Sequence, residues 1–159
     1  MEGVFLMDII KIINENRIDL HLKAKTKDEA LWELAQLLEN DGALASKEEF
    51  IKDVYLREEA GPTGLENHIA IPHGKSAAVL KTSLAIGRTK NEIDWETLDG
   101  KPVHCIILFA VRLVDQTTTH VKLLSQVAGA LADEDTVNFL LTEKDPTKII
   151  NLFDQRQSA

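Results

Sequence analysis

The chain has 159 residues, of which 44% are apolar and 28% charged, and its 18 basic and 26 acidic side chains give a formal net charge of −8. This length and composition predict a single globular domain, residues 1–159, that can bury a core of its own. No apolar run is long enough to cross a membrane and no signal peptide opens the chain, so we expect a cytoplasmic protein. The chain also has no cluster of Lys and Arg of the kind that binds the phosphates of a nucleic acid, so we expect no nucleic-acid binding.

The N-terminal part of the chain predicts one strand and two helices. Residues 17–22 alternate apolar and polar side chains, as a half-buried strand does. Thr26 and Ser46 each stand three residues ahead of a glutamate, and this capping-box pattern predicts a helix behind each of them. The second helix should end at Gly61-Pro62. The predicted apolar face of the first helix consists of Ala30, Leu31, Leu34, Ala35, Leu37 and Leu38.

The next segment places a histidine directly after a short strand. Residues 68–71 form the alternating run of that strand, and Pro72, with its fixed φ, ends it. His73 then stands at the strand end, and Gly74 lacks the Cβ that would crowd an approaching group. Ligand crevices of α/β proteins lie at such strand ends. The segment therefore predicts an imidazole at the rim of a sheet, where it suits nucleophilic chemistry.

Two stronger strands are predicted at about 83–88 and 103–111. The second is nearly continuous in apolar residues, which favours a central place in a sheet. Asp99-Gly100 between them predicts a turn. The lone Cys105 lies in the second strand, so we expect a buried structural thiol there and no internal disulfide.

Two further helices are predicted near the C-terminus. Thr117–Thr119 can cap the first, and Asp145-Pro146 predicts the start of the second. Strands interleaved with helices in this way predict an α/β layered domain. The predicted buried stripes are Leu124, Val127, Ala128 and Leu131 in the first of these helices and Ile149, Ile150 and Phe153 in the second.

The segment around His73 resembles the phosphorylation-site signature of the fructose/mannitol-type IIA proteins of the bacterial sugar phosphotransferase system, the EIIA type-2 domain. Further similar stretches at 83–87, 95–103 and 120–124 extend the resemblance over most of the chain. It implies a single α/β domain with a mixed, mostly parallel sheet and helices on both faces. The residues that match the signature are Thr63, Gly64, Ile69, Ala70, Ile71, Pro72 and His73.

The resemblance also implies a function and two partners. His73 would accept phosphate from the carrier HPr and pass it to a cysteine or histidine of a IIB domain or protein, which feeds sugar uptake. Phosphoryl transfer of this kind needs positioning and groups that hold the phosphoryl oxygens, so no cofactor, ATP or metal is expected. The membrane is reached only indirectly, through a IIC transporter. The sugar cannot be read from the chain, because this component never needs to bind it.

Two further residues complete the implied site. Similar proteins place a histidine at the position of His120, where it would donate a hydrogen bond to the phosphoryl oxygens or orient His73, and a helix N-terminus favours an anion there. Arg57 precedes the signature at the spacing of similar proteins, and its guanidinium fits phosphate geometry. The alternative interpretations are a strand-end histidine without function for His73, a solvent-exposed histidine for His120 and a helix-end arginine that complements the dipole for Arg57.

Two positions depart from the family pattern. Glycine is common in similar chains where His68 stands, and proline often follows the long strand where Arg112 stands. Both changes leave the expected chemistry intact. They bear on partner or substrate specificity.

Two other functions fit part of the sequence. A regulatory, nitrogen-type IIA protein shares the Pro72-His73 core, whereas residues 95–103 are more similar to the sugar-transport branch. A histidine-based metal enzyme would need clustered ligands, but His68 and His73 lie on opposite faces of an unbroken strand, and no His-Glu-x-x-His or Cys-x-x-Cys motif is present. We therefore expect a sugar-transport phosphoryl carrier.

Overall fold

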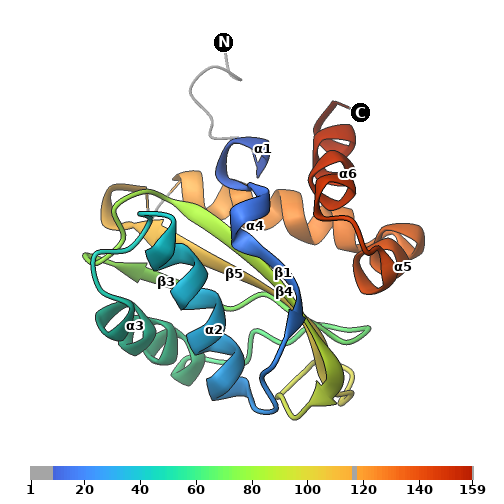
Figure 1. Cartoon of the computed structure of the whole chain (residues 1–159), viewed down its shortest axis with the longest axis horizontal. Helices are drawn as coiled ribbons and strands as arrows, with labels where there is room; N and C mark the ends of the chain where they lie inside the picture. Colours follow the sequence, from blue (N-terminus) through green and yellow to red (C-terminus); the bar gives the residue numbers. More distant parts are fainter. Residues whose placement is uncertain (1–8, 116–117, 159) are drawn as a thin grey trace.

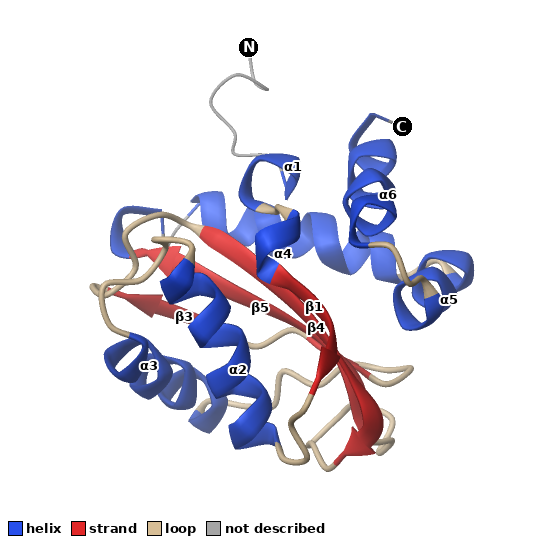
Figure 2. Ribbon diagram, in the orientation of Figure 1, coloured by secondary structure: helices blue, strands red, loops and turns tan. Residues whose placement is uncertain are grey.

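The computed structural model describes residues 9–115 and 118–158 and consists of one sheet between two layers of helices (Figures 1 and 2). The strand order is β1-β4-β5-β2, and β3 also pairs with β5. Among the strands of the described residues, β4 and β5 pair antiparallel and the other pairs are parallel. The mixed, mostly parallel sheet that we expected is confirmed. The strands are β1 (Ile18–Leu22), β2 (Ile69–Ala70), β3 (His73–Ser76), β4 (Ser83–Ile93) and β5 (Val103–Arg112).

Helices cover both faces of the sheet, and each face has its own apolar core (Figure 1). The first core packs α2 (Lys27–Asn40) and α3 (Lys47–Glu59) against one face. The second core lies on the opposite face, under the remaining helices. These are α1 (Ile9–Ile12), α4 (Thr118–Leu131), α5 (Glu134–Thr142) and α6 (Pro146–Ser158), with the short 3-10 helices η2 (Glu15–Arg17) and η3 (Leu113–Asp115) at strand ends.

The starts of α2 and α3 follow the predicted caps. The side chain of Thr26 accepts a hydrogen bond from the backbone N–H of Glu29, and Ser46 does the same for Glu49. Each cap satisfies an N–H group that a helix start leaves without a partner.

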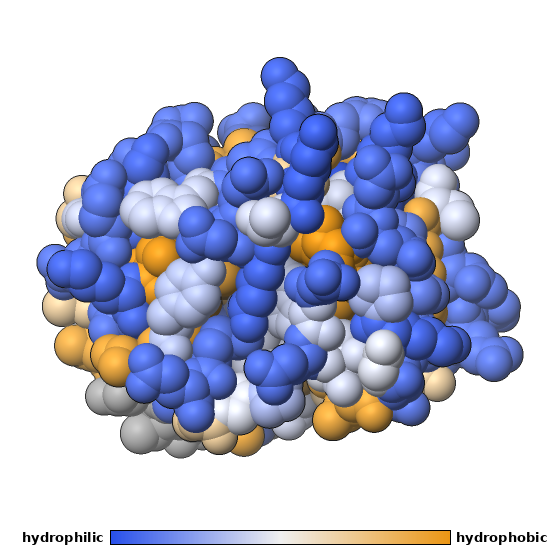
Figure 3. Space-filling view, turned by 90° about the horizontal axis from the view of Figure 1, so that it is seen from below, coloured by the Kyte–Doolittle hydropathy of each residue, from blue (hydrophilic) through white to orange (hydrophobic). Residues whose placement is uncertain are grey.

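On the face seen from below in Figure 3, hydrophilic residues predominate and hydrophobic ones form separate patches. Among the described residues no helix is long and apolar enough to cross a membrane.

The helical stripe predicted in α4 is correct in part, since Val127 is buried and Leu124 and Leu131 pack half-buried against the second core. The buried side chains are His120, Leu123, Val127 and Ala130, whereas Ala128 is exposed. The helix is apolar on more than one side, so periodicity alone does not fix which side is buried, and contact with the sheet determines that side.

The predicted burial of Cys105 is confirmed, and burial raises the pKa of its thiol to about 12.

His73 does not end a strand but begins one. β2 ends at Ala70, Pro72 follows, and the chain then resumes beside β5 as β3, with His73 paired to Phe109. The Pro72 carbonyl still accepts a hydrogen bond of 3.0 Å from the Phe109 N–H, which carries the chain past the interruption. Gly74 makes room for α3 rather than for a ligand, because a Cβ there would lie 2.9 Å from side-chain atoms of Phe50 and Val54.

Candidate functional site

Three elements bring Arg57, His73 and His120 together at the β3 edge of the sheet. Arg57 lies in the last turn of α3, His73 opens β3, and His120 lies in the first turn of α4 on the opposite face. Both imidazoles are buried, each with a residue exposure of 5%. The alternative of a solvent-exposed His120 is therefore wrong. The cap proposed at Thr117–Thr119 includes position 117, which lies outside the described residues, and Thr118 already belongs to α4.

Hydrogen bonds define the state of the His73 ring. Arg57 Nε donates to His73 Nε2 over 3.0 Å, and Arg57 Nη1 donates to the Gly61 carbonyl over 2.9 Å. Nε2 is therefore an acceptor and carries no proton. The proton lies on Nδ1, which donates to the Ile71 carbonyl over 3.3 Å. The His73 ring is therefore neutral, and its Nε2 lone pair points at the guanidinium of Arg57.

His120 completes the site from the other side. Its ring centroid lies 4.9 Å from that of His73, with the two planes inclined by 51°. Its Nδ1 is buried and has no hydrogen-bond partner within residues 9–115 and 118–158. Buried polar atoms are nearly always paired, so this orphan beside the His73 ring leaves a nitrogen available to a bound group.

Burial and neighbouring charge keep both imidazoles neutral. Burial is the main cause that lowers the pKa of His73 to about 4, and the charges of Arg57 and Lys75 add to it against the Ile71 hydrogen bond. The pKa of His120 is likewise about 4, first through burial and then through His73, Lys75 and Arg57. Lys75 itself is exposed on β3. At neutral pH both rings are uncharged.

A polar network behind Arg57 was not foreseen from the sequence. The side chain of Glu58, near the end of α3, is only 7% exposed and lies 2.5 Å from Lys27 Nζ. The buried Thr63 donates its hydroxyl hydrogen bond to the other oxygen of Glu58. Lys27 belongs to α2, far from the signature in sequence, so only Thr63, as part of the signature, gave any signal of this network.

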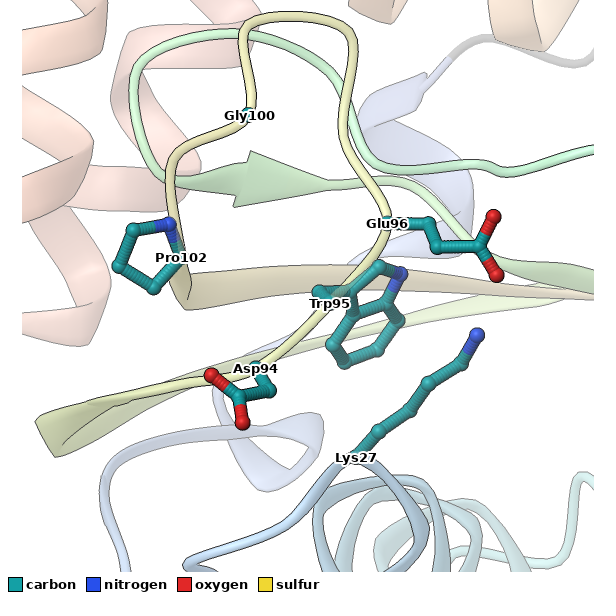
Figure 4. Close-up of a pocket in the computed structure, with 6 residues that line it drawn as sticks. All are labelled: Lys27, Asp94, Trp95, Glu96, Gly100 and Pro102. Carbon is teal, nitrogen blue, oxygen red and sulfur yellow. The ribbon is translucent and has the colours of Figure 1, made fainter.

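Beside this network lies a cleft of about 550 Å³ (Figure 4). Lys27 Nζ lies 4.9 Å from the ring centroid of Trp95, whose buried Nε1 has no hydrogen-bond partner among the described residues. Trp95 is thus a packed aromatic on the α2 side. The cleft is lined by Lys27, Asp94, Trp95, Glu96, Gly100 and Pro102, and so by none of the three predicted site residues.

The two departures from the family pattern have local structural explanations. His68 has a φ of 69°, a conformation that favours glycine, which accounts for the glycine of similar chains. Its Nδ1 lies 2.9 Å from the Pro102 carbonyl and 3.0 Å from Glu92, so the side chain holds this turn. The backbone N–H of Arg112 donates to Thr82 over 3.0 Å, a hydrogen bond that a proline could not make.

No group of three or more His, Cys, Asp or Glu side chains within the described ranges is arranged to hold a metal ion. The ring of His68 lies 5.6 Å from that of His104 rather than at His73. The histidines are thus divided between different parts of the sheet, and His21 is exposed on β1.

Comparison with known proteins identifies relatives that match nearly the whole chain. The family model described as phosphoenolpyruvate-dependent sugar phosphotransferase system, EIIA 2, matches residues 11–156. The chain is 30% identical over 152 residues to the PTS system 2-O-alpha-mannosyl-D-glycerate-specific EIIABC component of Escherichia coli, which covers 95% of this chain and 23% of that protein. It is 27% identical over 142 residues to the PTS system fructose-like EIIA component of the same bacterium, over 89% of this chain and 95% of that one.

A solved structure adds a regulatory relative. The nitrogen regulatory protein IIA-Ntr from Neisseria meningitidis matches with a TM-score of 0.83 and 29% identity, over 91% of this chain and 98% of that chain. The chain thus spans less than a quarter of the EIIABC relative but nearly all of the fructose-like EIIA component and of IIA-Ntr. Relatives with sugar-specific names and a relative with a regulatory name share this fold.

Proposed function

The chain belongs to the EIIA type-2 family of the phosphoenolpyruvate-dependent sugar phosphotransferase system, and we propose that it transfers phosphate between proteins through a phosphohistidine at His73. The observation that carries this proposal is the state of the His73 ring. Its Nε2 is unprotonated and lies 3.0 Å from Arg57 Nε, and its ring centroid lies 4.9 Å from that of His120, whose Nδ1 has no partner among the described residues. A neutral imidazole between a guanidinium and a second imidazole suits acceptance of a phosphoryl group.

The transfer proceeds by exchange of one P–N bond for another. Phosphorylated HPr presents its phosphohistidine, and the lone pair of His73 Nε2 forms the new P–N bond. The electron pair of the breaking bond stays on the donor nitrogen. The proton on His73 Nδ1 stays hydrogen-bonded to the Ile71 carbonyl, so the acceptor ring loses none. A cysteine or histidine of a IIB partner then attacks the same phosphorus atom, and the electron pair returns to Nε2.

Arg57 and His120 stabilise the charge that arrives with the phosphoryl group. The Nε2 lone pair can attack phosphorus only after it leaves the hydrogen bond with Arg57 Nε, which then donates to a phosphoryl oxygen instead. His120 supplies a second donor from the opposite side. Arg57 Nη1 remains bonded to the Gly61 carbonyl, which fixes the direction of the fork. Both residues act by positioning and electrostatics, the main requirements of phosphoryl transfer.

Exposed apolar side chains beside these residues support a protein partner. Leu56 precedes Arg57 and is 62% exposed, and Val121 follows His120 and is 59% exposed. Val114 of η3, just ahead of α4, is 77% exposed. Apolar residues at the rim of a reactive site suit transient docking of another protein. The net charge of −8 favours a partner with a basic docking face, such as we expect for HPr and IIB.

The proposal is tested by intact-mass analysis after incubation with phosphoenolpyruvate, Enzyme I and HPr. We expect wild type to gain one acid-labile phosphoryl group and His73→Ala to gain none. His21→Ala is the matched control, because His21 is exposed on β1, and it should be phosphorylated like wild type. Phosphorylation of His73→Ala, or none of wild type with a range of HPr proteins, would contradict the proposal.

A second candidate is regulation by phosphorylation state, favoured by the similarity to IIA-Ntr. We propose sugar uptake first, because residues 95–103 are more similar to the transport branch. Deletion of the gene, with growth measured on single phosphotransferase sugars, separates the two functions. Loss of growth on one sugar supports uptake, and normal growth on all of them supports regulation.

A further inference from the structure

A groove of about 610 Å³ lies at the opposite end of β5 from His73. Its walls come from the end of β1 with the loop behind it, from β4 and from the end of α5. His104 of β5 borders the groove, five positions before Phe109, the residue that pairs with His73. Five strand residues span about 17 Å, so the groove is separate from the site of phosphoryl transfer.

The groove concentrates positive charge in an acidic protein. None of its described lining residues is Asp or Glu, although the chain has 26 acidic side chains. A local excess of cations of this kind attracts anions even where the net charge is negative. The positively charged and imidazole side chains that line it are His21, Lys23, Lys25, Arg88, Lys90 and His104.

Carboxylates near the groove are already engaged elsewhere. Glu33 and Glu29 accept hydrogen bonds of 3.1 Å and 2.8 Å from the backbone N–H groups of Lys23 and Lys25. They fix the loop rather than pair with its ammonium groups. Glu92 lies 3.0 Å from His68, and its charge also acts on His104, where burial and His68 together lower the pKa of the ring. In the described part of the chain, neither lysine side chain forms an ion pair, and each is exposed.

Arg88 is the buried anchor of the groove. Its exposure is only 9%, and within the described residues its side chain makes one hydrogen bond, from Nη1 to the Leu140 carbonyl over 2.9 Å. That carbonyl lies in the last turn of α5, where helix carbonyls lack intrahelical partners, and it occupies one donor of the guanidinium. The remaining N–H groups have no partner within the described residues. Because these N–H groups are not fully buried and Arg88 lines the groove, they are available to an anion that enters it.

We propose that this groove binds the phosphomonoester of a small polyhydroxylated molecule, of the sugar-phosphate class. The Arg88 fork matches the geometry of a phosphate, and the lysines neutralise its second charge. Asn91 adds an exposed amide to the wall, and the buried Thr89 fixes this part of it by a hydrogen bond from Oγ1 to the Asn91 carbonyl. The volume lies in the range of small-molecule sites. Apart from imidazoles, no aromatic ring among the described lining residues could stack on a nucleotide base. The site does not depend on the function proposed for His73.

The proposal is tested by two-dimensional ¹H–¹⁵N NMR titration of the whole chain with glucose 6-phosphate, glucose and inorganic phosphate in parallel. Glucose 6-phosphate should shift the amide signals of residues 20–25 and 88–91 in a saturable way. Inorganic phosphate should shift the same signals more weakly, and glucose should not shift them. Absence of saturable shifts with glucose 6-phosphate would overturn the site. Equal binding of inorganic phosphate would overturn the sugar-phosphate assignment.

Two sets of matched variants separate this site from general charge attraction. The groove variant combines Lys23→Gln, Lys25→Gln and Lys90→Gln, and the control combines Lys52→Gln, Lys101→Gln and Lys148→Gln, which are exposed elsewhere. The groove variant should bind glucose 6-phosphate at least roughly tenfold more weakly, the worth of one lost charge-assisted hydrogen bond. The control should bind like wild type, and equal weakening of both would overturn the proposal.

A single substitution at Arg88 tests the anchor itself. Arg88→Lys keeps the charge but loses the planar fork, so it too should bind glucose 6-phosphate roughly tenfold more weakly. The amide spectrum reports whether the fold is intact, and the groove variant above decides the outcome if Arg88→Lys does not fold. Wild-type affinity in folded Arg88→Lys would overturn the role of the guanidinium.

Discussion

His73 has an unusual electrostatic environment for the phosphoryl acceptor that we propose it to be. A positive neighbour, Arg57, would attract the phosphoryl group, and at the same time it disfavours the imidazolium, which cannot attack phosphorus. Burial acts in the same direction and is the larger cause. The two effects together keep Nε2 unprotonated at physiological pH, with its lone pair in the hydrogen bond from Arg57 Nε.

We expect His73 to titrate with a midpoint near pH 4, well below the ordinary histidine value of 6.5. Long-range ¹H–¹⁵N NMR spectra recorded against pH measure the midpoint directly. Because the unfolded chain binds this proton more tightly, stability present above about pH 6.5 should decrease as the pH falls toward about 4. In Arg57→Gln the midpoint should move upward, because one cause of the shift is removed. A wild-type midpoint near 6.5 would contradict the neutral site.

Replacement of His120 by Ala should slow phosphorylation of His73 by roughly 10- to 100-fold, the effect of one lost hydrogen bond to a charged group. The final extent of phosphorylation should stay the same, because the nucleophile is intact. Quench-flow kinetics with phosphorylated HPr measure the rate. His120→Asn, whose amide can place a donor near the position of Nδ1, should recover part of it. Equal rates for wild type and His120→Ala would remove the role given to His120.

Between single residues and the whole fold, the contact of α3 with β3 decides the geometry of the site. Gly74 lets α3 approach the strand closely, and Arg57 stands at the end of the same helix, 3.0 Å from His73. Gly74→Ala should push α3 outward and destabilise the protein by about 1–3 kcal/mol through overpacking. Phosphorylation should slow as well, because Arg57 moves with the helix.

Gly129→Ala provides the control for this substitution. A Cβ at Gly129 meets nothing within 4 Å, and the residue lies in α4. This change should stabilise the protein by roughly 0.5–1 kcal/mol, the ordinary gain of Ala over Gly in a helix. Urea unfolding measures both variants. A stability of Gly74→Ala equal to that of wild type would show that α3 has more room than the structure indicates.

Local patterns predicted the elements that have local causes. The caps at Thr26 and Ser46 and the apolar run of β5 are short-range signals, and the structure confirms the helices and the strand. The short helix α1 and the nine-residue α5 were not predicted. α1 has only four residues, too few to show a period. Asp133 does cap α5, but it follows α4 so closely that no loop composition separates the two helices.

The candidate site was predicted through a motif rather than through geometry. The signature around His73 and the family spacing pointed to Arg57 and His120, and all three lie together in the structure. The Lys27–Glu58 pair and the groove at Arg88 depend on contacts between distant elements, for which one sequence contains no signal. The second strand at His73 was missed because Pro72 was expected to end the strand, whereas the chain resumes pairing with the same neighbour.

At the scale of the whole molecule, Arg17 joins elements that belong to both faces of the sheet. It is 4% exposed, and its Nη1 lies 2.5 Å from Asp41 at the end of α2. Its Nη2 donates to the Ile12 carbonyl of α1 over 2.9 Å, and its Nε donates to the Leu84 carbonyl of β4 over 3.3 Å. The two helical layers are thus linked by one guanidinium as well as by their apolar cores.

Arg17→Met should therefore lower the free energy of unfolding without changing the rate of phosphoryl transfer at His73. It leaves Asp41 without its cation and two backbone carbonyls without their donor, a loss of about 3 kcal/mol, which corresponds to a decrease in Tm of roughly 10 °C for a chain of this size. Differential scanning calorimetry measures the change, and Lys11→Met, an exposed charge change on α1, should stay within about 0.5 kcal/mol of wild type.

Because Arg17 makes no contact with His73, phosphorylation well below the Tm should proceed at the wild-type rate. An unchanged Tm would mean that the apolar cores alone hold the layers together, whereas a slow rate in the folded variant would mean that Arg17 influences the site through the sheet.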